Sequence, residues 1–117
     1  SYMSLSIHAS SSEPAPGRTV MLALKMTPKA GWHGYWSNPG DSGLPPTVKW
    51  DLPAGYSVGA LQHPAPKLFK VSGITSYVHA GPHVLLAPLK VPSSAKPGDS
   101  LPIRGKVDFL VCSDTLC

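Results

Sequence analysis

The two cysteines, Cys112 and Cys117, are the residues of this sequence best suited to chemistry. They lie at the end of residues 109–117, FLVCSDTLC, with four residues between them. Ser113, Asp114 and Thr115 favour a turn, so the chain can reverse and bring the two sulfurs within disulfide reach at a hairpin end. The spacing is not C-x-x-C, which excludes a thioredoxin active site.

A disulfide across such a short loop is expected to stabilise the fold only weakly. The chain-entropy contribution of a ring of about six residues is ~2 kcal/mol, against ~4.7 kcal/mol for a ring of a hundred residues. A bridge between near neighbours is nevertheless convenient for redox chemistry, because both sulfurs stay together through oxidation and reduction. Spacing alone therefore leaves two interpretations open, a redox-active pair and a plain structural disulfide.

Composition limits the architecture that can position this pair. The chain has 117 residues, of which 14 are Pro, 11 are Gly and 42% are apolar, so residues 1–117 fit a single domain with a core. Proline recurs too often for a helical bundle. Two cysteines are too few for a disulfide-dense scaffold or a four-cysteine zinc site.

Short stretches of period-two alternation predict strands throughout the chain. The expected strands are 3–7, 20–26, 32–36, 48–52, 56–60, 74–79, 84–91 and 101–112. Residues 37–46 are rich in Pro and Gly and are expected to form a loop, as are residues 62–67. Residues 74–79 and 84–91 look like a pair of strands joined at 80–82. This spacing of strands and turns predicts an all-β fold, an antiparallel β-sandwich.

The last expected strand carries the first cysteine. Val107, Phe109 and Val111 share its apolar face, so alternation places Cys112 on the polar face. A purely structural cysteine is more often buried.

Charge and hydropathy exclude two classes of partner. The net charge is +4, but the lysines are spread along the chain without clustering, so we expect no nucleic-acid binding. No apolar stretch approaches the length of a membrane span, so we expect no direct membrane insertion by this segment.

Three alternatives to redox chemistry follow from the residue types. Soft and borderline ligands suit a copper-binding or copper-tolerance module: the two cysteines, three methionines and five histidines (His8, His33, His63, His79 and His83). The histidines are scattered, and Met26 fits a packed strand better than a ligand set, so copper is possible but not favoured. Asn38 and Asp41 offer too few oxygens for a calcium loop. A structural immunoglobulin-like interaction domain is the third alternative.

Two longer motifs carry a family resemblance. Residues 31–45, GWHGYWSNPGDSGLP, and residues 109–117, together with Pro64-Ala65-Pro66 and Tyr77, resemble the N-terminal periplasmic domain of the DsbD/ScsB protein-disulfide reductases. The similarity is closer to the ScsB branch, which is associated with suppression of copper sensitivity. It covers residues 21–117.

The resemblance implies an immunoglobulin-like sandwich with a redox-active cysteine pair and no cofactor. In such reductases a membrane-embedded domain passes electrons through a thioredoxin-like domain of the same polypeptide to this pair. The pair then reduces thioredoxin-fold proteins of the periplasm. Carried over, Cys117 forms the mixed disulfide with the partner and Cys112 resolves it.

The resemblance also suggests neighbours for the cysteines. Phe69 corresponds to a phenylalanine that shields the pair, and Tyr35 and His33 correspond to aromatic residues beside it. Asp114 would oppose ionisation of the thiols, whereas Lys106 or a histidine would favour it. The family continues past the second cysteine, so we expect this chain to be a fragment of a larger membrane-anchored reductase, cut short at its C-terminal end.

Overall fold

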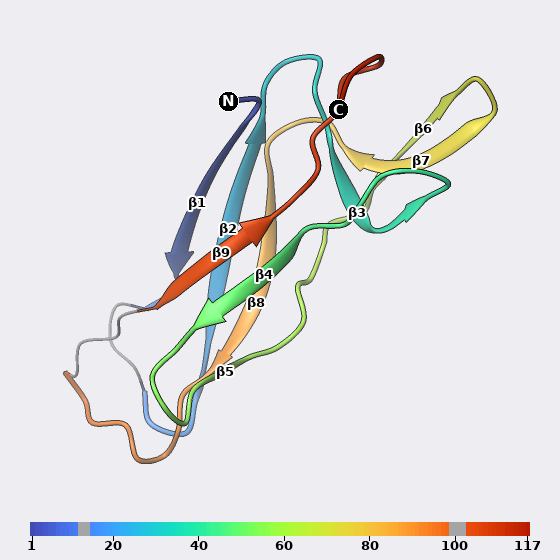
Figure 1. The fold of residues 1–117 in the computed structure, drawn as a ribbon. Coiled ribbons are helices and arrows are strands. Elements are labelled where there is room, and N and C mark those ends of the chain that lie inside the picture. Colours follow the sequence, from blue (N-terminus) through green and yellow to red (C-terminus); the bar gives the residue numbers. More distant parts are fainter. Residues whose placement is uncertain (12–14, 99–102) are drawn as a thin grey trace.

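The computed structural model describes residues 1–11, 15–98 and 103–117. These residues form nine strands and no helix, in an elongated molecule of 54 × 23 × 19 Å (Figure 1). The strands are β1 (Met3–Ala9), β2 (Thr19–Pro28), β3 (Gly34–Gly40), β4 (Thr47–Asp51), β5 (Ser57–Val58), β6 (Lys67–Val71), β7 (Ile74–His79), β8 (His83–Lys90) and β9 (Arg104–Asp108). The part of the chain that the structure describes contains no helix able to cross a membrane.

The largest sheet has the order β1-β2-β8-β5, and all of its pairings are antiparallel. Its two central strands alternate as the sequence predicts, because every second side chain of β2 and β8 points to the same face. The buried members of this face include Val20, Leu22, Leu24, Met26, Leu85, Ala87 and Leu89. Met26 is 2% exposed and packs in the core, as expected.

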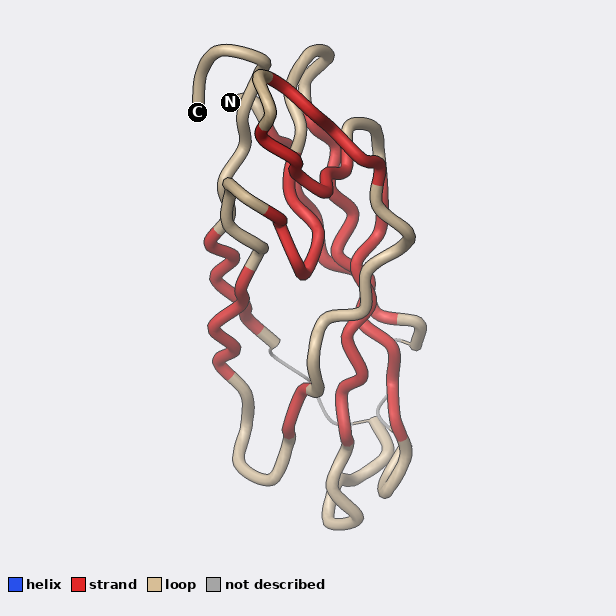
Figure 2. Tube along the Cα trace, turned by 90° about the vertical axis from the view of Figure 1, so that its right-hand side faces the viewer, coloured by secondary structure: helices blue, strands red, loops and turns tan. Residues whose placement is uncertain are grey.

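The antiparallel ribbon β4–β9 forms the opposite layer of the sandwich. Val48, Trp50 and Val107 from this ribbon pack against Leu24 and Leu85 of the large sheet. Trp50 also contacts the second apolar cluster, around Leu22 and Leu89. The core therefore lies between β2–β8 and β4–β9, whose crossing is visible in Figure 1, and Figure 2 shows the layers of strands from the side.

The third sheet, β3-β7-β6, lies at the same end of the molecule as the C-terminus (Figure 1). β6 and β7 form a hairpin with a two-residue turn at Ser72 and Gly73, whose φ angles are +51° and +80°. Positive φ at both central positions is typical of a type I′ turn, which suits the twist of a tight hairpin. Neither β6 nor this hairpin was expected from the sequence.

Two local predictions were wrong. Residues 74–79 and 84–91 were expected to pair, but β7 pairs with β3 and β6, whereas β8 pairs with β2 and β5. Residues 37–46 were expected to be loop, but β3 extends to Gly40, with an irregular register between Tyr35 and Gly40. Alternation identifies a strand, but it does not identify the partner on either side of it.

Candidate active site

Cys112 and Cys117 form a disulfide in this structure. The turn between them is held by Ser113, whose backbone N–H donates to the carbonyl oxygen of Leu116 at 2.7 Å. The Ser113 hydroxyl also accepts hydrogen bonds from the backbone N–H groups of Thr115, at 3.3 Å, and Leu116, at 3.0 Å. The turn that the sequence predicts therefore closes the ring between the two sulfurs.

The two cysteines differ in exposure. Cys112 is only 2% exposed, whereas Cys117 is exposed. The prediction that Cys112 lies on a polar, outward face was wrong, because β9 ends at Asp108 and the alternation breaks there. Phe109 is 37% exposed, and Leu110 instead packs inward beside Cys112.

A backbone bridge fixes Cys112 opposite His33. The His33 N–H donates to the Cys112 carbonyl oxygen at 2.8 Å, and the Cys112 N–H donates back to the His33 carbonyl oxygen at 3.0 Å. This reciprocal pair holds the C-terminal segment to the residues just before β3. It also places the side chains of His33 and Cys112 on the same face.

Aromatic rings surround the buried end of the disulfide. Tyr35 and Cys112 belong to one buried cluster, and Phe69 packs against it from β6. The His33 ring centroid lies 5.0 Å from that of Phe69 and 5.3 Å from that of Tyr35. The structure thus brings together all five residues singled out from the sequence: His33, Tyr35, Phe69, Cys112 and Cys117.

These five residues line a cavity of about 310 Å³. Its wall is completed by the turn 113–116 and by residues of the β6–β7 hairpin, among them Val71 and Ile74. Both cysteines line this cavity, so a group that enters it lies beside the hairpin that carries Phe69.

The loop after β3 packs against the Tyr35 ring. Gly43 has a φ of +96°, and a Cβ atom at this position would overlap the Tyr35 ring. Asp41 anchors the loop to the hairpin, because its carboxylate accepts the Thr75 N–H at 2.9 Å. The Ser42 and Ser76 hydroxyls add a hydrogen bond of 3.0 Å. The supporting roles of Ser42 and Gly43 were not expected from the sequence, although a glycine in a Pro- and Gly-rich stretch is a signal for such a close approach.

The site keeps its ionisable aromatic groups uncharged near neutral pH. Burial lowers the pKa of His33 below its usual value, while the Asp114 carboxylate opposes that shift. Burial also raises the pKa of the Tyr35 hydroxyl. The His33 Nε2 atom and the Tyr35 hydroxyl oxygen are 3.3 Å apart, within hydrogen-bond distance.

The cation expected beside the cysteines is not the one found there. Lys106 lies on β9 opposite Lys49, and it is not among the residues that line the cavity. Lys67 instead lines a smaller cavity of about 160 Å³ on the other side of Phe69, together with Trp32, His33 and Asp114. The long-range arrangement of the hairpin, which the sequence did not show, brings Lys67 to this position.

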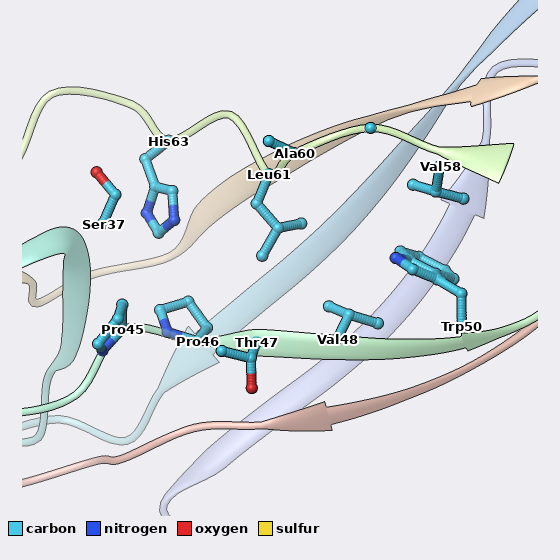
Figure 3. A pocket seen from close by; sticks show the side chains of 11 residues that line it. Ser37, Pro45, Pro46, Thr47, Val48, Trp50, Val58, Ala60, Leu61 and His63 are labelled. Carbon is cyan, nitrogen blue, oxygen red and sulfur yellow. The ribbon is translucent and has the colours of Figure 1, made fainter.

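A larger cavity, of about 420 Å³, lies between β4 and the segment after β5. In Figure 3, Val58 and Leu61 face Val48 and Trp50 across it. Its only titratable lining residue among those described is His63, and neither cysteine reaches it. This cavity therefore has less potential for chemistry than the smaller one over the disulfide.

The copper and calcium alternatives gain no supporting geometry. In the described residues, no group of three or more His, Cys, Asp or Glu side chains is arranged to hold a metal ion. The oxygens of Asn38 and Asp41 instead accept backbone N–H groups, from Gly40 and Thr75 respectively.

Replacing Phe69 with alanine should expose the disulfide. Because the ring packs over the cluster that contains Cys112, we expect Phe69→Ala to speed reduction by dithiothreitol by about tenfold. Phe109→Ala is the matched control, since Phe109 is 37% exposed and does not line the cavity. The rate is measured by thiol release at a fixed reductant concentration. Equal rates for the two variants would show that Phe69 does not shield the pair.

Comparison with known proteins identifies the family and the fold of the chain. The family model described as "Thiol:disulfide interchange protein DsbD, N-terminal" matches residues 7–117. Among curated proteins, none matches the chain significantly. The crystal structure of the N-terminal periplasmic domain of ScsB from Proteus mirabilis matches with a TM-score of 0.71 and 26% sequence identity.

That match covers 97% of this chain and 41% of the ScsB chain. It confirms the predicted immunoglobulin-like fold, and together with the family model it confirms the resemblance drawn from the sequence motifs. The chain belongs to the family of DsbD N-terminal domains, found in thiol:disulfide interchange proteins.

Proposed function

We propose that this chain is a periplasmic thiol-disulfide exchange domain that relays electrons through Cys112 and Cys117. The observation that carries the proposal is the asymmetry of the disulfide, with Cys117 exposed and Cys112 buried at 2% exposure. Exchange needs one sulfur that a partner can reach and a second that is protected until the first has reacted.

The reaction begins with the reduced pair. The Cys117 thiolate attacks a sulfur of the partner's disulfide, forms a mixed disulfide and releases the partner's other sulfur as a thiolate. The Cys112 sulfur, once deprotonated, then attacks Cys117 and displaces the partner's second thiolate. Two electrons pass to the partner, which leaves as a dithiol after taking up two protons, and the Cys112–Cys117 disulfide is formed.

The site offers little help in ionising the attacking thiol. The described residues contain no helix, so no helix N-terminus stabilises a thiolate, and Asp114 sits within the ring between the two cysteines. We therefore infer that specificity comes from docking around the cavity. Leu116 and Leu68 are suited to this role, with 63% and 58% of their surfaces exposed.

The surrounding electron path is part of the same proposal. The partners that receive electrons from this chain are thioredoxin-fold proteins of the periplasm. On the reducing side are a thioredoxin-like domain and a membrane-embedded domain of the same polypeptide, an inner-membrane protein-disulfide reductase. The family membership and the periplasmic location of the similar ScsB domain support this placement.

A direct test follows electron transfer to a partner. The reduced chain is mixed with an oxidised periplasmic thioredoxin-fold protein, and free thiols on both proteins are followed by alkylation and mass spectrometry. We expect one disulfide to form in this chain for each partner disulfide lost. A disulfide that resists mild reductants, with no transfer, would favour a structural domain. Stoichiometric copper retention by the reduced chain, again with no transfer, would favour a copper module.

A further inference from the structure

His33 and Cys112 form the tightest connection between the cysteine segment and the rest of the site. Their backbones exchange hydrogen bonds of 2.8 and 3.0 Å, so the two residues sit directly opposite each other. In an antiparallel pair the opposed Cβ atoms are about 5 Å apart on the same face. Both side chains line the cavity over the disulfide. An imidazole ring spans such a gap directly or through one water molecule.

The second step of exchange requires a base beside Cys112. Cys112 is 2% exposed, and burial in apolar surroundings raises the pKa of a thiol, so its proton must be taken by a nearby base. No lysine or arginine lies among the described residues that line the cavity. The titratable side chains there, apart from the cysteines, are His33, Tyr35 and Asp114.

Of these three, His33 has the chemistry of a base at neutral pH. Burial raises the pKa of Tyr35 and keeps its hydroxyl protonated, so Tyr35 serves as a hydrogen-bond partner 3.3 Å from the His33 Nε2 atom. Asp114 is exposed to solvent, and carboxylates as a class are far weaker bases than imidazoles. His33 is 6% exposed and therefore faces the site rather than bulk water.

We propose that His33 is the general base that deprotonates Cys112 in the resolving step. The imidazole accepts the Cys112 proton as the sulfur attacks Cys117, and the bond between Cys117 and the partner breaks. The imidazolium then gives the proton to the departing partner thiolate or to water, and His33 returns to its neutral form. The inference rests on the exchange function proposed above and assigns a catalytic role within it.

The surroundings of His33 set the pH range in which its imidazole can accept a proton. Burial, the larger influence, lowers its pKa, and Asp114 raises it in part. Lys67 faces it from β6 in the adjacent cavity, and Tyr35 faces it from β3. His33 is consequently neutral, and able to accept a proton, at pH 7 and somewhat below.

The test uses an aromatic disulfide, dithiobis(nitrobenzoate), as oxidant of the reduced chain. Its first coloured thiolate is released when Cys117 attacks, and its second when Cys112 resolves the adduct. In His33→Gln we expect the first phase to be unchanged and the second to slow by at least about tenfold at pH 7. The second phase should also lose the wild-type plateau and rise about tenfold per pH unit, as for an unassisted thiol.

Two further variants keep the result interpretable. His33→Phe retains ring packing against Phe69 and should show the same slow second phase as His33→Gln, which covers the case that the glutamine variant folds poorly. His8→Gln is the matched control, because His8 is exposed on β1. A second phase in either His33 variant that superimposes on the wild-type pH profile would overturn the proposal. Since the oxidant needs no protein partner, failure to reduce a thioredoxin-fold protein would count against the exchange function alone.

Discussion

Changing Cys112 to alanine is expected to convert a transient encounter into a stable mixed disulfide. In this variant the exposed Cys117 can still attack a partner, but no second thiol remains to resolve the adduct. The complex should therefore accumulate on non-reducing gels and disappear with reductant. Cys117→Ala should trap at least about a thousandfold less adduct per unit time, because the remaining thiol, Cys112, is almost completely buried.

Comparing the two single variants shows whether the partner is attacked by Cys117 alone or by either cysteine. Peptide mapping of the adduct should place the partner on Cys117, and the double alanine variant should form none. Equal trapping through either cysteine would show that burial of Cys112 does not set the order of the steps. Absence of an adduct in both single variants would end the exchange mechanism altogether.

The sequence identified which residues come together at the site more reliably than it identified their geometry. The spacing of Cys112 and Cys117 and the turn at Ser113 were readable because turn formation depends on adjacent residues. Alternation likewise revealed β2 and β8, whose buried side chains are all apolar. These features depend on local patterns, and local patterns are what a single sequence displays.

Features that depend on partners distant in sequence were not predictable in the same way. The inward rotation of Cys112 follows from a break in alternation after Asp108 and from pairing with His33, which lies 79 residues earlier (112 − 33). The hairpin that carries Phe69 was hidden because β6 has exposed residues on both faces, so it shows no clean alternation. Only the Ser72-Gly73 turn signalled it.

Three histidines cluster where the chain passes from the sheet β3-β7-β6 to the sheet β1-β2-β8-β5. His79 ends β7 and His83 begins β8, and their rings stack with centroids 4.4 Å apart. His63 lies on the other side, with its Nδ1 atom 3.4 Å from the Nε2 atom of His79. His79 and His83 also line a surface cavity between residues 64–67 and 78–83. Among the described residues that line it, the only other titratable side chain is Lys67, which is a cation and not an anion. A proton added to His79 would therefore find no compensating negative charge there.

Acid is expected to destabilise the fold through His79. Burial, followed by repulsion from His83 and His63, lowers the pKa of His79 to about 4. Between that value and the ordinary histidine pKa of about 6.5, the unfolded chain binds more protons than the folded chain, so the free energy of unfolding falls as pH falls. The shift corresponds to a loss of about 2 kcal/mol between pH 7 and pH 5.

Urea unfolding at a series of pH values measures this loss, with tryptophan fluorescence as the signal. His79→Phe keeps an aromatic ring at this position but cannot be protonated there. Between pH 7 and pH 5 its free energy of unfolding should therefore fall less than that of the wild type, and the difference should be most of the about 2 kcal/mol. His8→Gln, on the exposed strand β1, should retain the wild-type slope. The same slope in His79→Phe would assign the acid sensitivity to other groups. The expected slope follows from the topology, because β7 and β8 belong to different sheets and the connection between them brings the rings of His63 and His83 against that of the buried His79.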